Sequence, residues 1–423
     1  MNWPTELEVE HKLAQMRGWL EQQRAGGIRL RGADWFAWAT AGASNSQNPM
    51  SPCGGAELLV TRDRAYILSD EAEAPCLRED ALHGPWTWQV SPWMQPQLHE
   101  LREHFVQHAA GGASVLSDLP RLHECGLPTS MREERLVLLQ AEQQRYLHLG
   151  QLVASAASEA LRKARPDWTE RELAAACVRA LWLRGVQEVH IIALGAQRQS
   201  LYRRAPASAT TLGARAVLAV CARRHGLCAS LSRQVRFEHA GQILRHGHNI
   251  TKNGVKNGAN NGIDNGIDNG NNIDNGSNSA APGSTGNGAT GAITDHSSVA
   301  HDDATLLALE AVALDTCVAG NALSMVYHAL DSAYAYAGHP DTALRHRQGG
   351  IQGYLAPEVM ASAHTEITLK RGMAAALHPS LPCGMVEDTF LIDGDHLRNL
   401  TYDPAWPSTL IQGRRRPLTL VLG

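Results

Sequence analysis

Residues 216–235 read AVLAVCARRHGLCASLSRQV, and they indicate the fold more clearly than any other part of this 423-residue chain. Two strand-like segments, Ala216–Val220 and Ser230–Val235, lie on either side of a turn at Arg224–Gly226. Apolar and β-branched residues favour strands, and Gly favours the backbone of a tight turn. The stretch therefore predicts two neighbouring strands joined by that turn.

Helices and further strands are predicted around this pair. Arg132–Ala164 contains no Gly or Pro except Gly150 and predicts one long helix, and Thr169 with Glu172 forms a capping box that starts another. Two helices are expected near 305–319 and 321–337, ended by Gly338 and Pro340. The remaining predicted strands are residues 189–192, 366–369, 373–377, 389–392 and 417–421.

The beginning of the chain predicts a separate α/β domain. Helix-like apolar spacing over residues 5–26 is followed by strand candidates at 28–32, 56–61 and 65–68. We therefore expect an N-terminal domain at 1–125 and a second domain at 131–423.

Residues 247–300 consist largely of Asn-Gly and Asn-Gly-Ile-Asp repeats. Such a segment buries too little apolar area to offset the entropy of ordering, so we expect a disordered insertion within the second domain. Its Asp and Asn oxygens also suit calcium, but the spacings of the EF-hand and of the nonapeptide repeat are absent.

Composition excludes several classes of protein. The formal net charge of −4 lacks the basic surplus of a nucleic-acid binder, and no apolar run is long enough to span a membrane. The start of the chain does not have the pattern of a signal peptide. Eight cysteines without CxxC pairs predict neither a zinc site nor a disulfide framework, so we expect a cytoplasmic protein.

Several motifs, taken in order, resemble the M24 family, the pita-bread proteins that include aminopeptidase P, prolidase and creatinase. The segments that carry the resemblance are residues 219–235, 349–358, 370–379, 386–389 and 400–401, together with an N-terminal part at 6–82. The resemblance implies a creatinase-type N-terminal α/β domain followed by a pita-bread domain, an α/β (α+β) fold, and a homodimer.

The resemblance also implies a site of two metal ions held by two Asp, one His and two Glu, and here the chain departs from the pattern. The two Asp positions fall on Ala219 and Ser230, the His position on Gly349 or Gly350, and the first Glu position on His378; only Glu387 is retained. One Glu and one His cannot hold two divalent ions, which need several anionic ligands. We therefore expect no metal and no other cofactor.

The remaining polar residues suggest catalysis without metal, as the resemblance to creatinase implies. In this interpretation His378 and Glu387 are the catalytic acid–base pair. The residues expected to contact a small amide or peptide ligand are Ser230, Arg203, Arg204 and Glu358.

Structural roles for the same residues stay open. Glu387 is equally suited to an ion pair with Arg233 or Arg371, and His378 to filling the space of the missing Glu. Ser230 has no evident activating base, and the thiols of Cys228 and Cys383 are expected to be buried and inert.

Two functions are compatible with this pattern. The first is a metal-independent hydrolase of an amide, peptide or amidine C–N bond. The alternative is a catalytically inactive pseudopeptidase that acts as a binding or dimeric interaction module, since a fold alone does not determine function.

Overall fold

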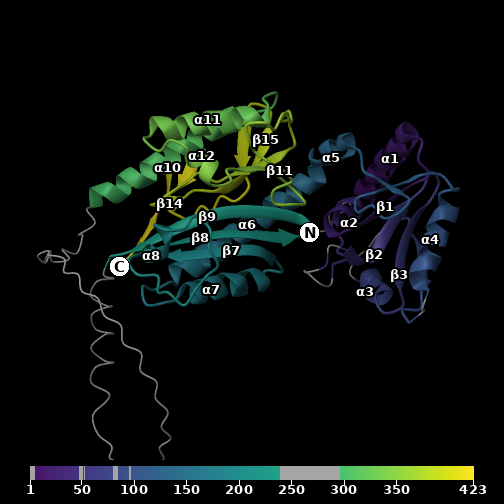
Figure 1. The fold of residues 1–423 in the computed structure, drawn as a ribbon. Coiled ribbons are helices and arrows are strands. Elements are labelled where there is room, and N and C mark those ends of the chain that lie inside the picture. Colours follow the sequence, from purple (N-terminus) through teal and green to yellow (C-terminus); the bar gives the residue numbers. More distant parts are fainter. Residues whose placement is uncertain (1–4, 47–50, 52, 80–83, 95–96, 239–295) are drawn as a thin grey trace, which may run out of the picture.

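The computed structural model describes residues 5–46, 51, 53–79, 84–94, 97–238 and 296–423, which form two domains connected by a short helix, α5 (Figure 1). The N-terminal domain consists of α1 (Thr5–Gln23), β1 (Gly27–Gly32), α2 (Ala33–Ala39), β2 (Cys53–Val60), β3 (Ala65–Asp70), α3 (Ala74–Glu79), β4 (Thr87–Ser91), α4 (Leu98–Ala109), β5 (Val115–Ser117) and β6 (Glu124–Gly126). Helix α5 spans Thr129–Arg135.

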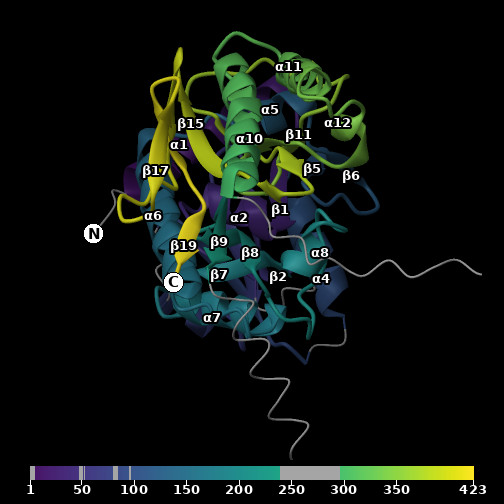
Figure 2. The same cartoon turned by 90° about the vertical axis from the view of Figure 1, so that its left-hand side faces the viewer.

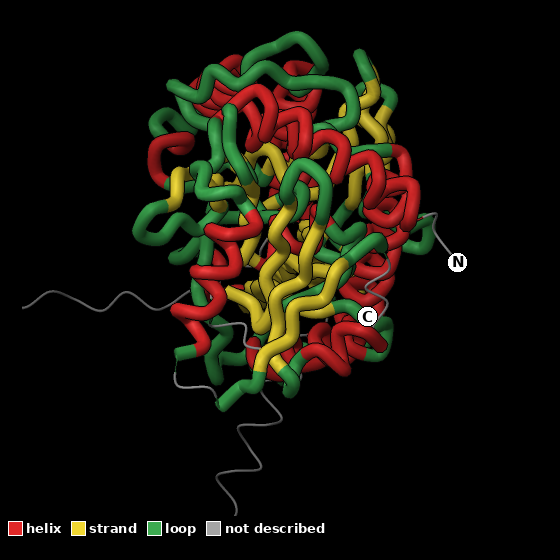
Figure 3. Tube along the Cα trace, turned by 90° about the vertical axis from the view of Figure 1, so that its right-hand side faces the viewer, coloured by secondary structure: helices red, strands yellow, loops and turns green. Residues whose placement is uncertain are grey.

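The N-terminal sheet has six strands in the order β4-β3-β2-β1-β5-β6, with helices on both faces (Figure 3). Strand β1 has side chains that alternate between those faces. Ile28 and Leu30 pack in the core with Leu13 of α1, whereas Arg29 faces α4 and donates to both oxygens of Glu103 at 2.7 and 2.8 Å. The apolar residues of β1 thus hold α1, and its arginines hold α4 through buried ion pairs.

The second domain contains two αβ halves. The first half consists of α6 (Gln140–Arg162), α7 (Glu170–Trp182), β7 (Gln187–Gly195), α8 (Ala196–Gln199), β8 (Arg215–Arg224) and β9 (Leu227–Phe237). The second half consists of α10 (His296–Thr316), α11 (Leu323–Tyr336), α12 (Thr342–Arg345), β10 (Gly349–Gln352), β11 (Val359–Met360), β12 (Ala374–Leu377), β13 (Ser380–Leu381), β14 (Gly384–Met385), β15 (Asp388–Asp393) and β16 (His396–Asn399). The chain ends with β17 (Ser408–Ile411), β18 (Arg414–Pro417) and β19 (Leu420–Leu422).

Two sheets form the centre of this domain, in the orders β19-β9-β8-β7 and β11-β10-β12-β15-β16. They meet where β9 passes β15: the Ser232 amide donates to the Glu387 carbonyl at 2.9 Å, and the Ser230 amide donates to Thr389 Oγ1 at 2.8 Å. Helices α6 and α7 cover the first sheet, and α10 and α11 cover the second (Figures 1 and 2). This is the pita-bread arrangement that the resemblance predicts.

The predicted strand pair at 216–235 is confirmed. Strands β8 and β9 are antiparallel from Arg215 opposite Arg236 to Arg224 opposite Leu227. The turn between them places His225 and Gly226 at φ +50° and +78°. The capping box of Thr169 and Glu172 is also present at the start of α7.

Other predictions of local structure are wrong. The long helix predicted at 132–164 is two helices, because the chain turns at 136–139, where the Leu138 amide donates to the carbonyl of Gly372. Residues 366–369 form only an isolated bridge between Thr368 and Ala322, and the strand predicted at 417–421 is divided between β18 and β19. The predicted insertion at 247–300 lies outside the described residues except for its last five positions, which belong to α10.

A buried cluster of charges joins the two domains. Lys12 of α1 donates to Glu8 at 2.7 Å, to Glu142 of α6 at 2.8 Å and to the carbonyl of Trp38. Arg145 of α6 donates to both oxygens of Glu8, and the Tyr354 hydroxyl donates to Glu142 at 2.6 Å. Because removal of one partner leaves a buried charge unpaired, this interdomain cluster fixes how the domains pack.

Within the described residues, no helix combines the length and apolar character needed to cross a membrane.

Candidate active site

A cavity of about 200 Å³ lies where the two halves of the second domain meet. Its lining comes from both sheets and from the segments that follow α8 and α12. The lining residues are His190, Arg204, Ser230, Arg347, Gly349, Gly350, Gln352, Ala356, Pro357, Met360, Ala376, His378 and Glu387. Ser230, His378 and Glu387, distant in sequence, are therefore brought together as expected.

Glu387 presents an unpaired carboxylate to this cavity. Its side chain is buried, yet no described residue forms a hydrogen bond or ion pair with the carboxylate. The candidate partners are engaged elsewhere: Arg233 donates to Asp388 at 2.9 Å, and Arg371 pairs with Asp393 at 2.7 Å. Neither Arg233 nor Arg371 therefore forms the ion pair with Glu387 that the sequence left open.

The surroundings of Glu387 raise the pKa of its carboxyl group. Burial raises the pKa of this carboxyl to about 7, the Arg204 guanidinium opposes that rise, and the Asp388 and Glu310 carboxylates add to it. A group with such a pKa can both accept and donate a proton near pH 7.

His378 is buried beside Glu387 in the lining of the same cavity, and its ring is neutral. Its Nε2 lies 3.1 Å from Arg204 Nη2, and its Nδ1 has no hydrogen-bond partner among the described residues. Burial first, and then the positive charge of Arg204, hold the pKa of His378 well below its usual value. Because Arg204 can only donate, Nε2 accepts and the ring proton is on Nδ1.

Ser230 lines the cavity but is not activated as a nucleophile. Its Oγ accepts from Gln352 Nε2 at 3.0 Å, and no described histidine or carboxylate contacts it. Ala219, also expected in this pocket, instead packs with Ile192, Leu194 and Met385 in a separate apolar cluster.

The cavity lacks side chains at Gly349 and Gly350 for a structural reason. Gly349 has φ +96°, and a Cβ at this position would lie 2.1 Å from the carbonyl oxygen of Ala376. A Cβ on Gly350 would lie 2.0 Å from the carbonyl oxygen of Val359. A histidine cannot stand at either position without a shift of the backbone.

The other two residues expected at the site lie outside the cavity lining. Arg203 is half-buried next to Arg204. Glu358 forms an ion pair with Arg135, which also bonds Asp34 of the N-terminal domain at 2.7 Å. Glu358 borders a second cavity, of about 490 Å³, at the domain interface.

The donor set does not fit the two metal ions that the fold family implies. His378 and Glu387 are the only residues at the five family positions with a strong ligand atom, and a guanidinium already occupies the Nε2 lone pair of His378. Among the described residues, no group of three or more His, Cys, Asp or Glu side chains is arranged to hold a metal ion. The side chains at these positions therefore do not support a mechanism through bound metal.

Sequence reasoning missed several residues near the cavity. His190 and Arg347 line it, and His346 Nε2 lies 2.8 Å from the Ser380 hydroxyl. Ser380 is buried and does not belong to the lining of this cavity, so this pair holds the His346 ring in place rather than forming a nucleophile at the site. No sequence motif indicates these contacts, because they depend on how α12 packs against β13.

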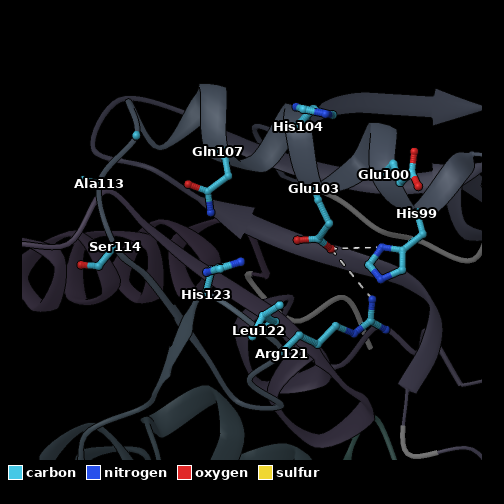
Figure 4. Close-up of a pocket in the computed structure, with 11 residues that line it drawn as sticks. His99, Glu100, Glu103, His104, Gln107, Ala113, Ser114, Arg121, Leu122 and His123 are labelled. Atoms are coloured by element: carbon cyan, nitrogen blue, oxygen red, sulfur yellow. Dashed lines mark ion pairs between the residues drawn. The ribbon is translucent and has the colours of Figure 1, made fainter.

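A larger cavity, of about 730 Å³, lies elsewhere, between α4 and the segment around β6. In Figure 4, Glu103, Gln107, Arg121 and His123 face one another across it. The Glu103 carboxylate is engaged by Arg29, and Glu100, the other acid in the lining, is exposed, so this pocket has no buried, unpaired acid to compare with Glu387.

No protein-family model and no curated protein matches this chain. Solved structures do match along almost its whole length. A prolidase from Thermococcus sibiricus superposes with a TM-score of 0.67 at 13% identity, covering 100% of both chains. Dipeptidase PepE from Mycobacterium ulcerans has a TM-score of 0.65 at 16% identity, covering 100% of this chain and 99% of the other.

The N-terminal domain of FACT complex subunit SPT16 from chickpea also matches, with a TM-score of 0.60 at 12% identity over 93% of this chain and 96% of the other. These likenesses show the fold: the chain has the pita-bread fold of the M24 peptidases and a creatinase-type N-terminal domain, as its motifs predicted.

Proposed function

We propose that this chain, which has a peptidase-like hydrolase fold, is a metal-independent hydrolase of an amide, peptide or amidine C–N bond. The observation that carries the proposal is Glu387: a buried, unpaired carboxyl whose pKa is raised to about 7, next to a neutral His378 in one cavity. Structural carboxylates are paired or solvated, so an unpaired buried one marks a candidate catalytic group.

The chemistry follows from the protonation states. The ionised Glu387 accepts a proton from a water molecule, whose oxygen forms a bond to the carbonyl or amidinium carbon. The protonated Glu387 then delivers that proton to the leaving nitrogen as the C–N bond breaks. The neutral His378 and the Arg204 guanidinium line the cavity together with Glu387, and in this proposal they orient the carbonyl or amidinium group of the substrate.

The substrate-contacting residues have separate roles in this proposal. Arg204 lines the cavity and holds His378 in its neutral tautomer, Arg203 is its neighbour in the chain, and Ser230 offers a hydroxyl in the cavity wall. Glu358 affects the cavity indirectly. Its carboxylate accepts hydrogen bonds from the amides of Tyr354 and Leu355, and so holds the segment that includes Pro357 of the cavity wall.

The test is hydrolysis of small amides, amidines and Xaa-Pro dipeptides in the presence of a chelator. We expect turnover that Glu387→Gln and His378→Ala each reduce by about a hundredfold or more, the usual contribution of a general acid–base group. Glu100→Gln, an exposed carboxyl outside the cavity, is the matched control and should leave the rate unchanged. If both substitutions leave turnover intact, the acid–base assignment is wrong.

The second candidate is a pseudopeptidase that binds without turnover. It is favoured by the absence of a paired nucleophile at Ser230 and by the likeness to a domain of a FACT complex subunit. Binding of a small amide or peptide by the wild-type chain, with no hydrolysis under any condition of the screen, supports this alternative.

We further propose that the chain acts as a homodimer in the cytoplasm. Light scattering of the purified protein at micromolar concentration tests the assembly, and a monomer mass refutes the homodimer.

A further inference from the structure

Two arginines line the cavity of the candidate active site, Arg204 and Arg347, and two more lie near them along the chain, Arg203 and Arg345; the four are together called the arginine cluster. Arg203 and Arg204 follow α8 in the first half of the domain, and Arg345 and Arg347 lie at the end of α12 and just after it in the second half. Arg204 and Arg347 line the cavity itself. The cluster therefore exists only when the two halves are packed together.

The members of the arginine cluster are close enough to affect nearby groups electrostatically. The pKa of Arg203 is lowered first by burial and, further, by the charge of Arg345. Burial first, and then the charges of Arg203 and Arg204, lower the pKa of His346 to about 4. The histidines here are consequently neutral, and the positive charge comes from the arginines alone.

The positive charge of the arginine cluster has no matching acid in the described part of the chain. None of its four members forms an ion pair with a described carboxylate, whereas Arg29, Arg233 and Arg416 each do. Glu387 is the one acidic residue that lines the cavity. Since arginine stays protonated in proteins, the excess is balanced only by solvent ions or by an anionic ligand.

We propose that the arginine cluster binds a phosphate group of a small molecule whose remaining part occupies the cavity beside Glu387 and His378. A phosphate offers two negative charges and several acceptor oxygens to planar guanidinium groups, which bind it in pairs of hydrogen bonds. The cavity of about 200 Å³ equals about seven water molecules in volume, so the part of the ligand that it holds is small.

This inference rests on the proposed function in one respect, namely that the cavity holds the substrate; it then assigns the substrate a phosphate next to the C–N bond. It does not require Glu387 to be catalytic.

The experiment is calorimetric titration of the full chain with inorganic phosphate, and with acetate, at constant ionic strength. The variants are the doubles Arg203→Gln/Arg204→Gln and Arg345→Gln/Arg347→Gln. The matched control is Arg62→Gln/Arg64→Gln, which removes two exposed arginines from a turn of the N-terminal domain. Unfolding midpoints of all variants show whether each is folded.

We expect phosphate to bind at least tenfold more tightly than acetate, and each double variant in the cluster to weaken phosphate binding by tenfold or more, with no effect of the control. Equal binding by the cluster variants and the control, or no phosphate binding at all, overturns the inference. Acetate binding as tight as phosphate overturns the assignment of phosphate and indicates a carboxylate ligand instead.

Glu387→Gln separates this inference from the proposed function. If the hydrolase is real and the phosphate site is not, turnover of amides depends on Glu387 while the cluster variants bind phosphate like the wild type. If only the phosphate site is real, phosphate binding depends on the cluster and persists in Glu387→Gln, and no amide is hydrolysed.

Discussion

Replacement of Glu387 by Gln should make the protein more stable at pH 8, which is the reverse of the usual effect of a buried substitution. Burial raises the pKa of Glu387 from an ordinary 4.5 to about 7. A carboxyl whose folded pKa is raised contributes stability that is fully present below its unfolded pKa and is lost as pH rises through the folded value.

The magnitude follows from the size of the shift. A difference of about 2.5 units at about 1.4 kcal/mol per unit is about 3 kcal/mol, the cost of holding the ionised carboxylate in the folded cavity at pH 8. Glutamine has the same shape and no charge, so Glu387→Gln should recover about 3 kcal/mol of unfolding free energy at pH 8. The gain should fall to near zero below about pH 4, where Glu387 is largely protonated in both states.

The assay is urea denaturation of wild type and Glu387→Gln at four values between pH 5 and pH 8. The neighbouring residue provides the control, because Asp388→Asn leaves Arg233 without its buried carboxylate and removes one of the two that pair with Arg416, the other being Glu310; it should cost about 3–5 kcal/mol at pH 8. The pKa of Asp388 is lowered by those arginines against the opposing effect of burial, so its contribution is lost as pH falls. An unfolding free energy difference for Glu387→Gln that does not change with pH refutes the reasoning.

Metal content, the interdomain cluster and the Asn- and Gly-rich segment each give a further prediction. Purified protein should contain no stoichiometric transition metal, and chelators should leave stability and activity unchanged; about one metal per chain in elemental analysis contradicts this, and His378→Ala and Glu387→Gln should then each release it. Lys12→Met removes the cation at the centre of the interdomain cluster and should lower the unfolding free energy by about 3–5 kcal/mol, whereas Lys163→Met, an exposed residue paired on the surface of α6, should change it by less than about 1 kcal/mol in the same urea assay. Deletion of residues 247–295 should leave the unfolding midpoint within a few degrees, because this segment lacks core-forming side chains and loop closure costs only about 0.6 kcal/mol per doubling of length; failure of the deletion variant to fold contradicts the prediction.

The fold was predictable where local signals and long-range packing agree. The pair β8–β9 combines apolar strands with a Gly-containing turn, and Thr169 with Glu172 caps α7 as its sequence indicates. The break between α5 and α6 was not predictable, because it depends on a hydrogen bond from Leu138 to Gly372, far along the chain.

The site was predictable only in part, for a related physical reason. Family positions identified Glu387 and His378, since strand order determines where they lie. Glu387 is unpaired because Arg233 pairs with Asp388 instead. Glu387 and Asp388 are adjacent in sequence, so the sequence alone does not say which of them forms that ion pair. Alternation along the chain places Asp388 on the arginine side and Glu387 in the cavity.

The interdomain cluster limits which domain recombinations this protein tolerates during evolution. Lys12 and Glu8 come from the first helix, whereas their partners Glu142, Arg145 and Tyr354 belong to the second domain. Tyr354 also begins the segment that leads to Pro357 in the cavity wall. A recombination event that joined this second domain to a different N-terminal domain would leave the buried Arg145 without the Glu8 carboxylate, and Glu142 without the Lys12 ammonium, with only Tyr354 and the Leu139 amide as partners. The two domains are therefore inherited as one unit, and a chimera is viable only if it carries the Lys12 side of the interface with it.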